Sequence, residues 1–283
     1  MRKRRIFQRA GNQTEVTLGS FSLRQRQVHL ITNQMPNSWM IGFMIIFLSC
    51  NLEEEMDDNS GPKLELIGSY TLEVPEPSGL TLNADGTALY SVSDPPDNSI
   101  YKLDLFGNTK KTLSYTGDDL EGITYDNRDN TLWIAEERLR EVVHLDTLGN
   151  ELDRFSINFD GLSSIHGFEG IMYNPVTSRI SLLNEKNPGA FIELDSTMNI
   201  SKELSLNFAQ DYSGLCFNSA NGNFMIVSDE SQQLIEWNLD EGVIHTYSLD
   251  IEKAEGVDYD PAINRVYIVC DSEQRLYIYG IQH

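Results

Sequence analysis

The chain has 283 residues, with 43 acidic residues against 21 basic ones and a formal net charge of −22. Seven basic residues and one acidic residue lie in the first 50, so the rest of the chain contains 42 acidic and 14 basic residues. A body this acidic repels phosphate backbones, which argues against nucleic acid as a partner. Hydrophobic residues make up 40%, enough for a packed core, and three cysteines are too few for a disulfide scaffold or a four-thiolate zinc site.

The strongest apolar run without charge spans residues 39–48. As a helix it would rise about 15 Å, half of the ~30 Å that a bilayer requires, so its length suits the hydrophobic region of a signal peptide. The run ends in Phe47-Leu48-Ser49-Cys50, which resembles the lipobox of bacterial lipoproteins. That resemblance implies that Cys50 is lipidated, and we expect residues 1–50 to be a signal peptide. The long segment before the run leaves Met35 or Met40 as possible starts, and a buried helix of the domain is the alternative.

Residues 51–63 are acidic and nearly free of apolar side chains. Such a segment cannot bury enough surface to offset its ordering entropy, so it is expected to be a flexible tether. Its acids resemble the surface-export signal of Bacteroidetes lipoproteins. We therefore expect a protein anchored through Cys50 to a membrane of the bacterial cell envelope, with the outer membrane or cell surface favoured and the leaflet left open.

The rest of the chain contains five copies of one short pattern, whose glycines are 43, 48, 44 and 42 residues apart. Regular spacing near 44 residues is typical of repeat architectures. The five tetrads are Pro77-Ser78-Gly79-Leu80, Leu120-Glu121-Gly122-Ile123, Phe168-Glu169-Gly170-Ile171, Tyr212-Ser213-Gly214-Leu215 and Ala254-Glu255-Gly256-Val257.

Each tetrad begins a predicted strand, which a turn rich in Asn, Asp, Gly or Pro joins to a second, β-branched or aromatic strand. The second strands are expected at 89–92, 132–135, 180–183, 224–227 and 266–269, and the third at 100–105, 142–146, 191–195, 234–239 and 276–281. The first four repeats also supply a fourth strand, and no long segment has helical periodicity. Four short antiparallel strands per repeat indicate an all-β fold of the β-propeller class.

The number of blades follows from the two ends of the repeat region. The fifth repeat stops after its third strand, whereas an extra strand, residues 64–72, precedes the first tetrad. Pairing the two would close the ring and remove exposed edges. We therefore predict a five-bladed β-propeller over residues 64–283; a sandwich or solenoid would not explain the missing and the extra strand.

Propeller topology places two sets of polar residues on one face. The tetrads contribute Glu121, Glu169 and Glu255, with Ser78 and Ser213, at the entrance of the central channel. The links from second to third strands contribute Asp94, Glu137, Glu185, Asp229 and Asp271, joined by Glu136, Asn184 and Glu230. These acids could instead cap backbone amides or be solvated turn residues. If they converge, they need a cation, and oxygen ligands favour calcium over zinc. The five histidines are scattered, and only His166 is expected near this face.

The tetrads, together with the second-strand ends at 133–138, 183–188 and 227–231, resemble the SdiA-regulated (YjiK-like) family over residues 64–283. The resemblance implies a five-bladed propeller of the bacterial envelope, similar to NHL-repeat proteins, with a calcium site on one face. No enzymatic activity is established for that family. Carried over by position, the metal ligands would be Glu121, Glu137, Glu169, Glu185 and Glu255.

Two functions follow. The first is a monomeric, membrane-anchored, calcium-binding module that recognises a protein or saccharide on one propeller face. The alternative is a calcium-dependent hydrolase similar to the lactonase and esterase propellers, in which the ion polarises a carbonyl or activates water. There His166 or an unligated carboxylate would be the base, and Ser78 or Ser213 a nucleophile without a visible histidine partner. A scaffold without metal is a third possibility, and Cys216 and Cys270 are expected in the core.

Overall fold

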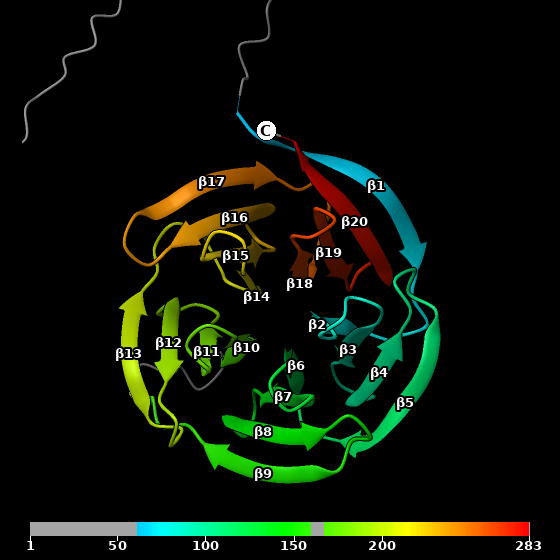
Figure 1. The fold of residues 1–283 in the computed structure, drawn as a ribbon, viewed down its shortest axis with the longest axis vertical. Coiled ribbons are helices and arrows are strands. Elements are labelled where there is room, and N and C mark those ends of the chain that lie inside the picture. Colours follow the sequence, from blue (N-terminus) through cyan, green and yellow to red (C-terminus); the bar gives the residue numbers. More distant parts are fainter. Residues whose placement is uncertain (1–60, 160–166, 283) are drawn as a thin grey trace, which may run out of the picture. The chain divides into compact units, whose positions relative to one another are not determined.

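The computed structural model describes residues 61–159 and 167–282, which form five four-stranded antiparallel sheets arranged around a central axis (Figure 1). Each sheet is one blade, with its strands ordered from the axis outward. Blade 1 contains β2 (Pro77–Leu82), β3 (Leu89–Ser93), β4 (Ser99–Leu103) and β5 (Thr109–Thr116); blade 2 contains β6 (Leu120–Asp126), β7 (Thr131–Glu136), β8 (Glu141–Asp146) and β9 (Glu151–Ser156).

The remaining blades repeat this order. Blade 3 contains β10 (Phe168–Asn174), β11 (Arg179–Asn184), β12 (Ala190–Leu194) and β13 (Ile200–Ser205); blade 4 contains β14 (Gly214–Asn218), β15 (Asn223–Ser228), β16 (Gln233–Asn238) and β17 (Gly242–Ser248); blade 5 contains β18 (Ala254–Asp260), β19 (Arg265–Cys270), β20 (Arg275–Gln282) and β1 (Lys63–Thr71). The five-bladed prediction is confirmed, and none of the described residues forms a helix.

The two ends of the propeller are joined by β1, the outermost strand of blade 5. It runs antiparallel to β20, in a register from Lys63 opposite Gln282 to Thr71 opposite Arg275, with one bulge between Leu66 and Gly68. Figure 1 shows this pair where the first and last described strands meet. The predicted closing strand, residues 64–72, is therefore confirmed with a shift of one residue.

The tetrad glycines allow the inner strands of adjacent blades to approach closely. A Cβ atom on Gly79 would lie 2.6 Å from the carbonyl oxygen of Glu121, and one on Gly122 would lie 2.9 Å from that of Glu169. Gly214 and Gly256 meet the backbone of the next blade in the same way. Glycine recurs in the pattern because any side chain there would push neighbouring blades apart.

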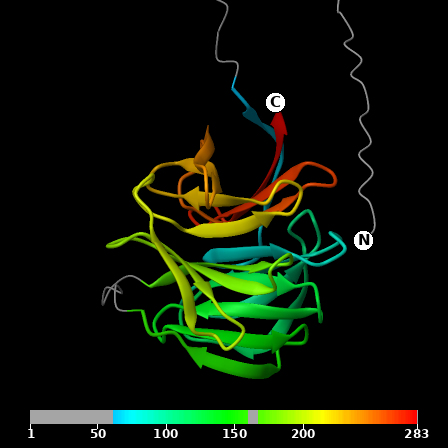
Figure 2. The same cartoon turned by 60° about the vertical axis from the view of Figure 1, so that its left-hand side comes forward.

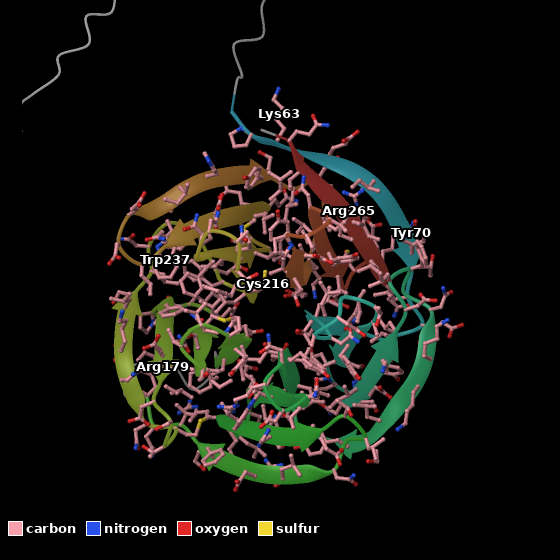
Figure 3. All side chains as sticks on the ribbon, viewed as in Figure 1. Lys63, Tyr70, Arg179, Cys216, Trp237 and Arg265 are labelled. Atoms are coloured by element: carbon pink, nitrogen blue, oxygen red, sulfur yellow. The ribbon has the colours of Figure 1, made fainter. Side chains whose placement is uncertain are left out.

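The hydrophobic core is divided into five clusters, one between each pair of adjacent blades, as the side chains in Figure 3 illustrate. The cluster between blades 3 and 4, for example, packs Phe191 against Phe224 and Trp237. Cys216 and Cys270 are both buried free thiols, as expected. Within the described residues no helix is long and apolar enough to cross a membrane. Figure 2 shows the same blades in an oblique view, turned by 60° from that of Figure 1.

Candidate metal centre

The channel enclosed by the five inner strands contains two chambers. The upper chamber, about 350 Å³, lies where these strands begin, and the lower chamber, about 310 Å³, lies where they end and turn. Between them a waist of about 10 Å³ is lined largely by the tetrad glycines and by the aliphatic residue that follows each glycine: Leu80, Ile123, Ile171, Leu215 and Val257.

The upper chamber is strongly acidic. Ten carboxylate side chains and two lysines line it, with Ser78, Ser213 and Pro77. The carboxylates are Glu76, Asp94, Glu121, Glu169, Glu185, Asp211, Asp229, Glu230, Glu255 and Asp271, and the lysines are Lys186 and Lys253. The predicted convergence of the tetrad acids and the link acids on one face is therefore observed.

A β-bulge at the start of the inner strands places the tetrad acids in this chamber. In blade 2, Leu120 pairs with Glu136 and Gly122 with Ala135, so that Glu121 has no partner in the ladder. Glu169 is unpaired in the same way in blade 3. A bulge re-aims the side chain of its extra residue, and here the repeated bulge explains why these glutamates leave the sheet and face the channel.

Two blades have serine in place of the tetrad glutamate, and each has an acid two positions earlier. Glu76 precedes Ser78 in blade 1, and Asp211 precedes Ser213 in blade 4. Both acids line the upper chamber. All five blades therefore contribute a carboxylate at their entry. The shared Asp/Glu-x-Ser-Gly spacing is the signal that would have revealed them.

Asp94, Asp119 and Glu121 form a triad whose carboxylate oxygens lie within 4.8 Å of one another, and they could hold a metal ion. Glu121 is 8% exposed, and burial, with the nearby Asp94 charge, raises its pKa well above the usual value. Burial likewise raises the pKa of Asp94 to about 6, and its Oδ1 is buried without a hydrogen-bond partner. The compensation comes from Ser78, whose Oγ donates to Glu121 Oε2 at 2.8 Å, and from Arg138, which pairs with Asp119 at 3.0 Å. Asp94 Oδ1 is thus a buried acceptor without a partner inside a cluster of negative charges, an arrangement that fits a bound cation.

No described residue donates a hydrogen bond to the carboxylate of Glu169 or of Glu255, although the charge of Lys253 acts to lower the pKa of Glu255. Burial is the main cause that raises the pKa of Glu169 well above its usual value, and the charges of Glu121 and Glu137 raise it further. Burial and the Asp229 charge raise the pKa of Glu255 to about 7. These two side chains carry the least compensated charge in the chamber.

The opposite side of the chamber is partly neutralised by the two lysines. Lys186 Nζ lies 2.6 Å from Glu185 Oε1 and 2.8 Å from Glu230 Oε1. Lys253 Nζ lies 2.8 Å from Asp271 Oδ2. Asp271 also interacts with Glu76, and the hydrogen bond and charge repulsion between them raise the pKa of Glu76. Two lysines against ten acids leave the chamber negative.

Glu137, one of the acids predicted at this face, has a different contact. Glu137 Oε1 accepts a hydrogen bond from the Gly167 amide at 2.6 Å, and the side chain does not line the chamber. It still contributes to the field, since its charge helps to raise the pKa of Glu169. The role of Glu137 as a metal ligand stays a prediction. The hydrogen bond from the Gly167 amide is the contact expected under the alternative, in which Glu137 caps a backbone amide.

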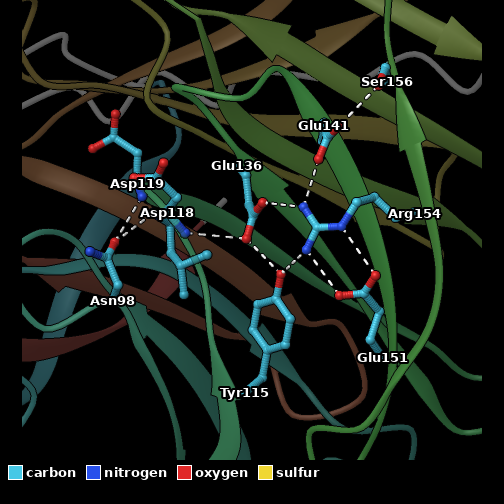
Figure 4. A network of polar contacts seen from close by, with 10 residues as sticks. Asn98, Tyr115, Asp118, Asp119, Glu136, Glu141, Glu151, Arg154 and Ser156 are labelled. Atoms are coloured by element: carbon cyan, nitrogen blue, oxygen red, sulfur yellow. Dashed lines mark hydrogen bonds and ion pairs between the residues drawn. The ribbon is translucent and has the colours of Figure 1, made fainter.

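Glu136 does not join the other acids. It is 1% exposed and faces the contact between blades 1 and 2, where Arg154 Nη1 donates to it at 2.6 Å and the Tyr115 hydroxyl at 2.6 Å (Figure 4). Arg154 also binds Glu141 and Glu151. Glu136 is the last residue of β7 and its side chain is directed between blades 1 and 2, so the expectation that it joins the acids of this face was wrong. Asn184 is also buried, with its Nδ2 donating to the Pro188 carbonyl at 2.6 Å.

The donor set of the upper chamber is made of oxygen atoms, and no cysteine or histidine is among the residues that line it. Such a set suits hard cations and not zinc. Two further predicted positions, His166 and the lipidation site Cys50, lie outside the described residues.

A family model described as SdiA-regulated matches residues 71–278. Among solved structures, glutaminyl cyclase from Myxococcus xanthus is similar at 12% identity and a TM-score of 0.61, over 78% of this chain and 97% of that one. A streptogramin B lyase is similar at 15% identity and a TM-score of 0.47, over 75% and 68% of the two chains. An inactive virginiamycin B lyase from Staphylococcus aureus with quinupristin gives 14% identity and a TM-score of 0.47, over 72% and 66%. At 12% identity the similarity to the glutaminyl cyclase shows the fold alone.

Proposed function

Since this chain belongs to the SdiA-regulated family, we propose that it is a calcium-binding β-propeller that acts as an interaction module of the bacterial cell envelope. The calcium ion would occupy the upper chamber. Glu121 and Asp94 would bind it together with Glu169 and Glu255, while Glu185 and Glu137 support the site from the adjoining blade links.

The observation that carries this proposal is the state of Glu169 and Glu255. Two carboxylates at the channel entrance have raised pKa values and no donor among the described residues. Leaving such charges without compensation costs several kcal/mol, which a bound divalent cation offsets. The orphaned Asp94 Oδ1 points to the same need.

Calcium fits the chamber better than magnesium does. Calcium accepts six to eight oxygen ligands at about 2.3–2.6 Å in irregular arrangements, whereas magnesium demands a compact octahedron and keeps several waters. Acids contributed by five separate blades supply many oxygens without octahedral order, and the volume of about 350 Å³ leaves room for additional water ligands.

Calcium titration followed by thermal unfolding tests the site. Calcium should raise the unfolding temperature of the wild-type protein by about 10 °C at saturation, the effect of roughly 4 kcal/mol on a domain of this size. Glu121→Gln and Glu169→Gln should each lose most of that increase. Glu241→Gln is the matched control, since it removes one charge from an exposed residue outside the chamber. A full calcium response in both chamber variants would remove these residues from the site.

The envelope location is a separate part of the proposal and depends on residues 1–63. The lipobox at Phe47–Cys50 and the acidic tether support attachment through a lipid on Cys50, with the outer membrane or cell surface as the site. Cell fractionation tests it: the wild-type protein should sediment with membranes, and Cys50→Ser should be released. Equal sedimentation of the two proteins would contradict lipid anchoring.

We propose that the monomeric propeller presents the upper face to a protein or a saccharide, with the calcium ion exposed at its centre. A hydrolase is the second candidate, favoured by the chamber volume, since about 350 Å³ exceeds what an ion and its waters require. In that case calcium would polarise a substrate carbonyl. Ser78 is poorly suited as a nucleophile because its hydroxyl is engaged by Glu121. Turnover of lactone or ester substrates that depends on calcium would favour the hydrolase over the binding module.

A further inference from the structure

The lower chamber has a different chemistry from the upper one. Four of the five blades place an aromatic residue three positions after the tetrad glycine, and the fifth places a leucine there. All five residues line the chamber: Leu82, Tyr125, Tyr173, Phe217 and Tyr259. Tyr173 is buried, and the other three aromatic residues are half-buried, so they present part of their surface to the chamber.

The tyrosine hydroxyls are held away from the centre by the turns. The hydroxyl of Tyr125 donates to Asn130 Oδ1 at 3.2 Å, and that of Tyr259 donates to Asn264 Oδ1 at 3.2 Å. Asn130 and Asn264 belong to the turns that end the inner strands and do not line the chamber. The turns thereby engage the hydroxyls of Tyr125 and Tyr259, and the chamber wall combines the aromatic rings with polar side chains such as Asn83, Asn127 and Ser219.

The charged groups of the lower chamber are all negative and lie on two adjacent blades. Asp85 belongs to the turn of blade 1, and Asp258 and Asp260 belong to blade 5. The turns of the two blades meet, because a Cβ atom on Gly86 would lie 3.0 Å from Asp260 Oδ2. No lysine or arginine is among the residues that line this chamber. One side of the chamber is therefore acidic, and the aromatic wall extends around the others.

Asp258 is committed to structure rather than to a ligand. Its Oδ2 accepts hydrogen bonds from the Leu82 amide at 2.6 Å and the Thr81 hydroxyl at 3.1 Å, and its Oδ1 accepts from the Tyr259 amide. Asp260 is different, since its Oδ1 accepts from the Ala262 amide at 2.9 Å and no described donor contacts its Oδ2. Asp260 thus keeps an open oxygen at the chamber mouth, as does Asp85, whose Oδ1 alone accepts the hydrogen bonds from Thr87.

We propose that the lower chamber is a second binding site, for a small organic cation with apolar substituents, such as a quaternary ammonium compound or an alkylated amine. The positive centre would face the Asp260 side, and its substituents would contact the rings of Tyr125, Tyr173 and Tyr259. Aromatic faces attract cations most strongly where water is excluded, and they bind quaternary ammonium groups that hydrogen-bonding sites reject. One of these rings already contacts a cation, since the Arg128 guanidinium lies over Tyr173 at 5.8 Å.

Anionic ligands do not fit this chamber, because only acids contribute charge to it. A metal ion does not fit it either, because the carboxylates lie on one side and the other blades contribute aromatic rings, Asn127 and Ser219 rather than further acids. The waist of about 10 Å³ separates it from the upper chamber, so this site is independent of the calcium proposal.

Isothermal titration of the protein with choline and with its neutral isostere 3,3-dimethylbutan-1-ol tests the proposal. Choline should bind at least about fivefold more tightly than the isostere, as expected for a cation on partly desolvated aromatic rings. Tyr259→Leu and Asp260→Asn should each weaken choline binding about three- to tenfold, whereas Tyr259→Phe, which keeps the ring, should retain it.

Calcium separates the two chambers in the same experiment. Choline held by the acids of the upper chamber would be displaced by calcium, whereas choline in the lower chamber should bind equally with saturating calcium and with a chelator. Competition by calcium, equal affinity for the two isosteres, or no saturable choline binding up to about 10 mM to the folded protein would each overturn the proposal.

Discussion

The two chambers are built by the same five strands and differ only in which strand positions face them. In blades 2 and 3 a bulge at the start of the inner strand turns a glutamate into the upper chamber, and in every blade the residue three positions beyond the tetrad glycine, an aromatic residue or a leucine, lines the lower one. The upper chamber concentrates charge that it does not neutralise. The lower chamber satisfies Asp258 with three donors and is otherwise lined by aromatic, aliphatic and uncharged polar side chains together with Asp85 and Asp260. The upper chamber is therefore the end of the propeller at which we propose an ion, and the lower chamber the end at which we propose an organic ligand.

The largest expected effect is a reversal of stability that depends on calcium. The double variant Glu169→Gln/Glu255→Gln removes two desolvated charges that have no donor among the described residues. In a chelator it should therefore be more stable than the wild-type protein by about 2–4 kcal/mol. In saturating calcium the order should reverse, because the wild-type protein alone retains the full set of ligands.

Chemical denaturation in both conditions measures this reversal, with Glu241→Gln as the control that should follow the wild type. If the double variant is less stable than the wild type in the chelator as well, the two glutamates are stabilised by contacts within the protein, and the contrast between the chambers is lost.

The next effect is a dependence on pH that calcium should suppress. The pKa of Glu255 in the folded protein is raised to about 7 from an ordinary value near 4.5, so the folded state binds more protons than the unfolded state between these values. The stability of the calcium-free protein should therefore fall as pH rises from about 4.5 to about 7. Bound calcium favours the charged carboxylate and should remove this part of the fall.

A smaller part of this fall in stability with rising pH should persist in calcium, because burial raises the pKa of Asp258 in the lower chamber to about 6. Asp258→Asn should abolish that remainder. Exposed turn acids such as Asp146 and Asp195 have lowered pKa values and act only at more acidic pH. Thermal unfolding between pH 4.5 and 8, with and without calcium, checks the scheme; a calcium-free protein that gains stability over this range would contradict it.

The upper chamber was largely predictable from the sequence, and the lower one was not, for a physical reason. The spacing of the tetrads revealed the blades, and the topology then brought Glu121, Glu169 and Glu255 together. Charged residues at repeated positions have few structural explanations, so they stand out. Tyr125, Tyr173 and Tyr259 repeat just as regularly. An aromatic residue in a strand is ordinarily explained by core packing, so only the three-dimensional structure reveals that these residues line a cavity.

The errors within the upper chamber also have local causes. Glu136 was expected there with Glu137, yet its side chain points between blades 1 and 2, where Arg154 and Tyr115 bind it. Glu76 and Asp211 were overlooked because they precede the tetrads and lie outside the inner strands. Their side chains reach the chamber from the loops that enter blades 1 and 4, and no rule of strand periodicity applies to such loops.

A change in the lower half of the channel should alter stability without altering the response to calcium. The Tyr173 amide donates to the buried Thr124 hydroxyl at 2.9 Å, and the Tyr125 amide donates to Thr81 at 3.2 Å in the same way, which ties each blade to the preceding one. Thr124→Val leaves a buried amide without an acceptor and should cost about 1–2 kcal/mol.

Thr124→Ser keeps the hydroxyl and is the control. Denaturation should show the same loss for Thr124→Val in calcium and in a chelator. A loss that appears only in calcium would mean that the waist transmits changes between the chambers, and the two halves could no longer be treated as independent.

The smallest effect concerns the serines of the upper chamber, which differ in how firmly they hold an acid. Ser78 Oγ donates to Glu121 Oε2 at 2.8 Å, whereas Ser213 Oγ lies 3.4 Å from Asp211 Oδ2. The short bond favours the charged form of Glu121, which is the form that binds a cation. Ser78→Ala should therefore weaken calcium binding about fivefold, the equivalent of roughly 1 kcal/mol, and Ser213→Ala should weaken it less. Calcium titrations of the two variants at neutral pH measure the difference. If both variants lose the same affinity, the serine hydroxyls bind the ion or its waters directly, and the acid-holding role assigned to Ser78 is wrong.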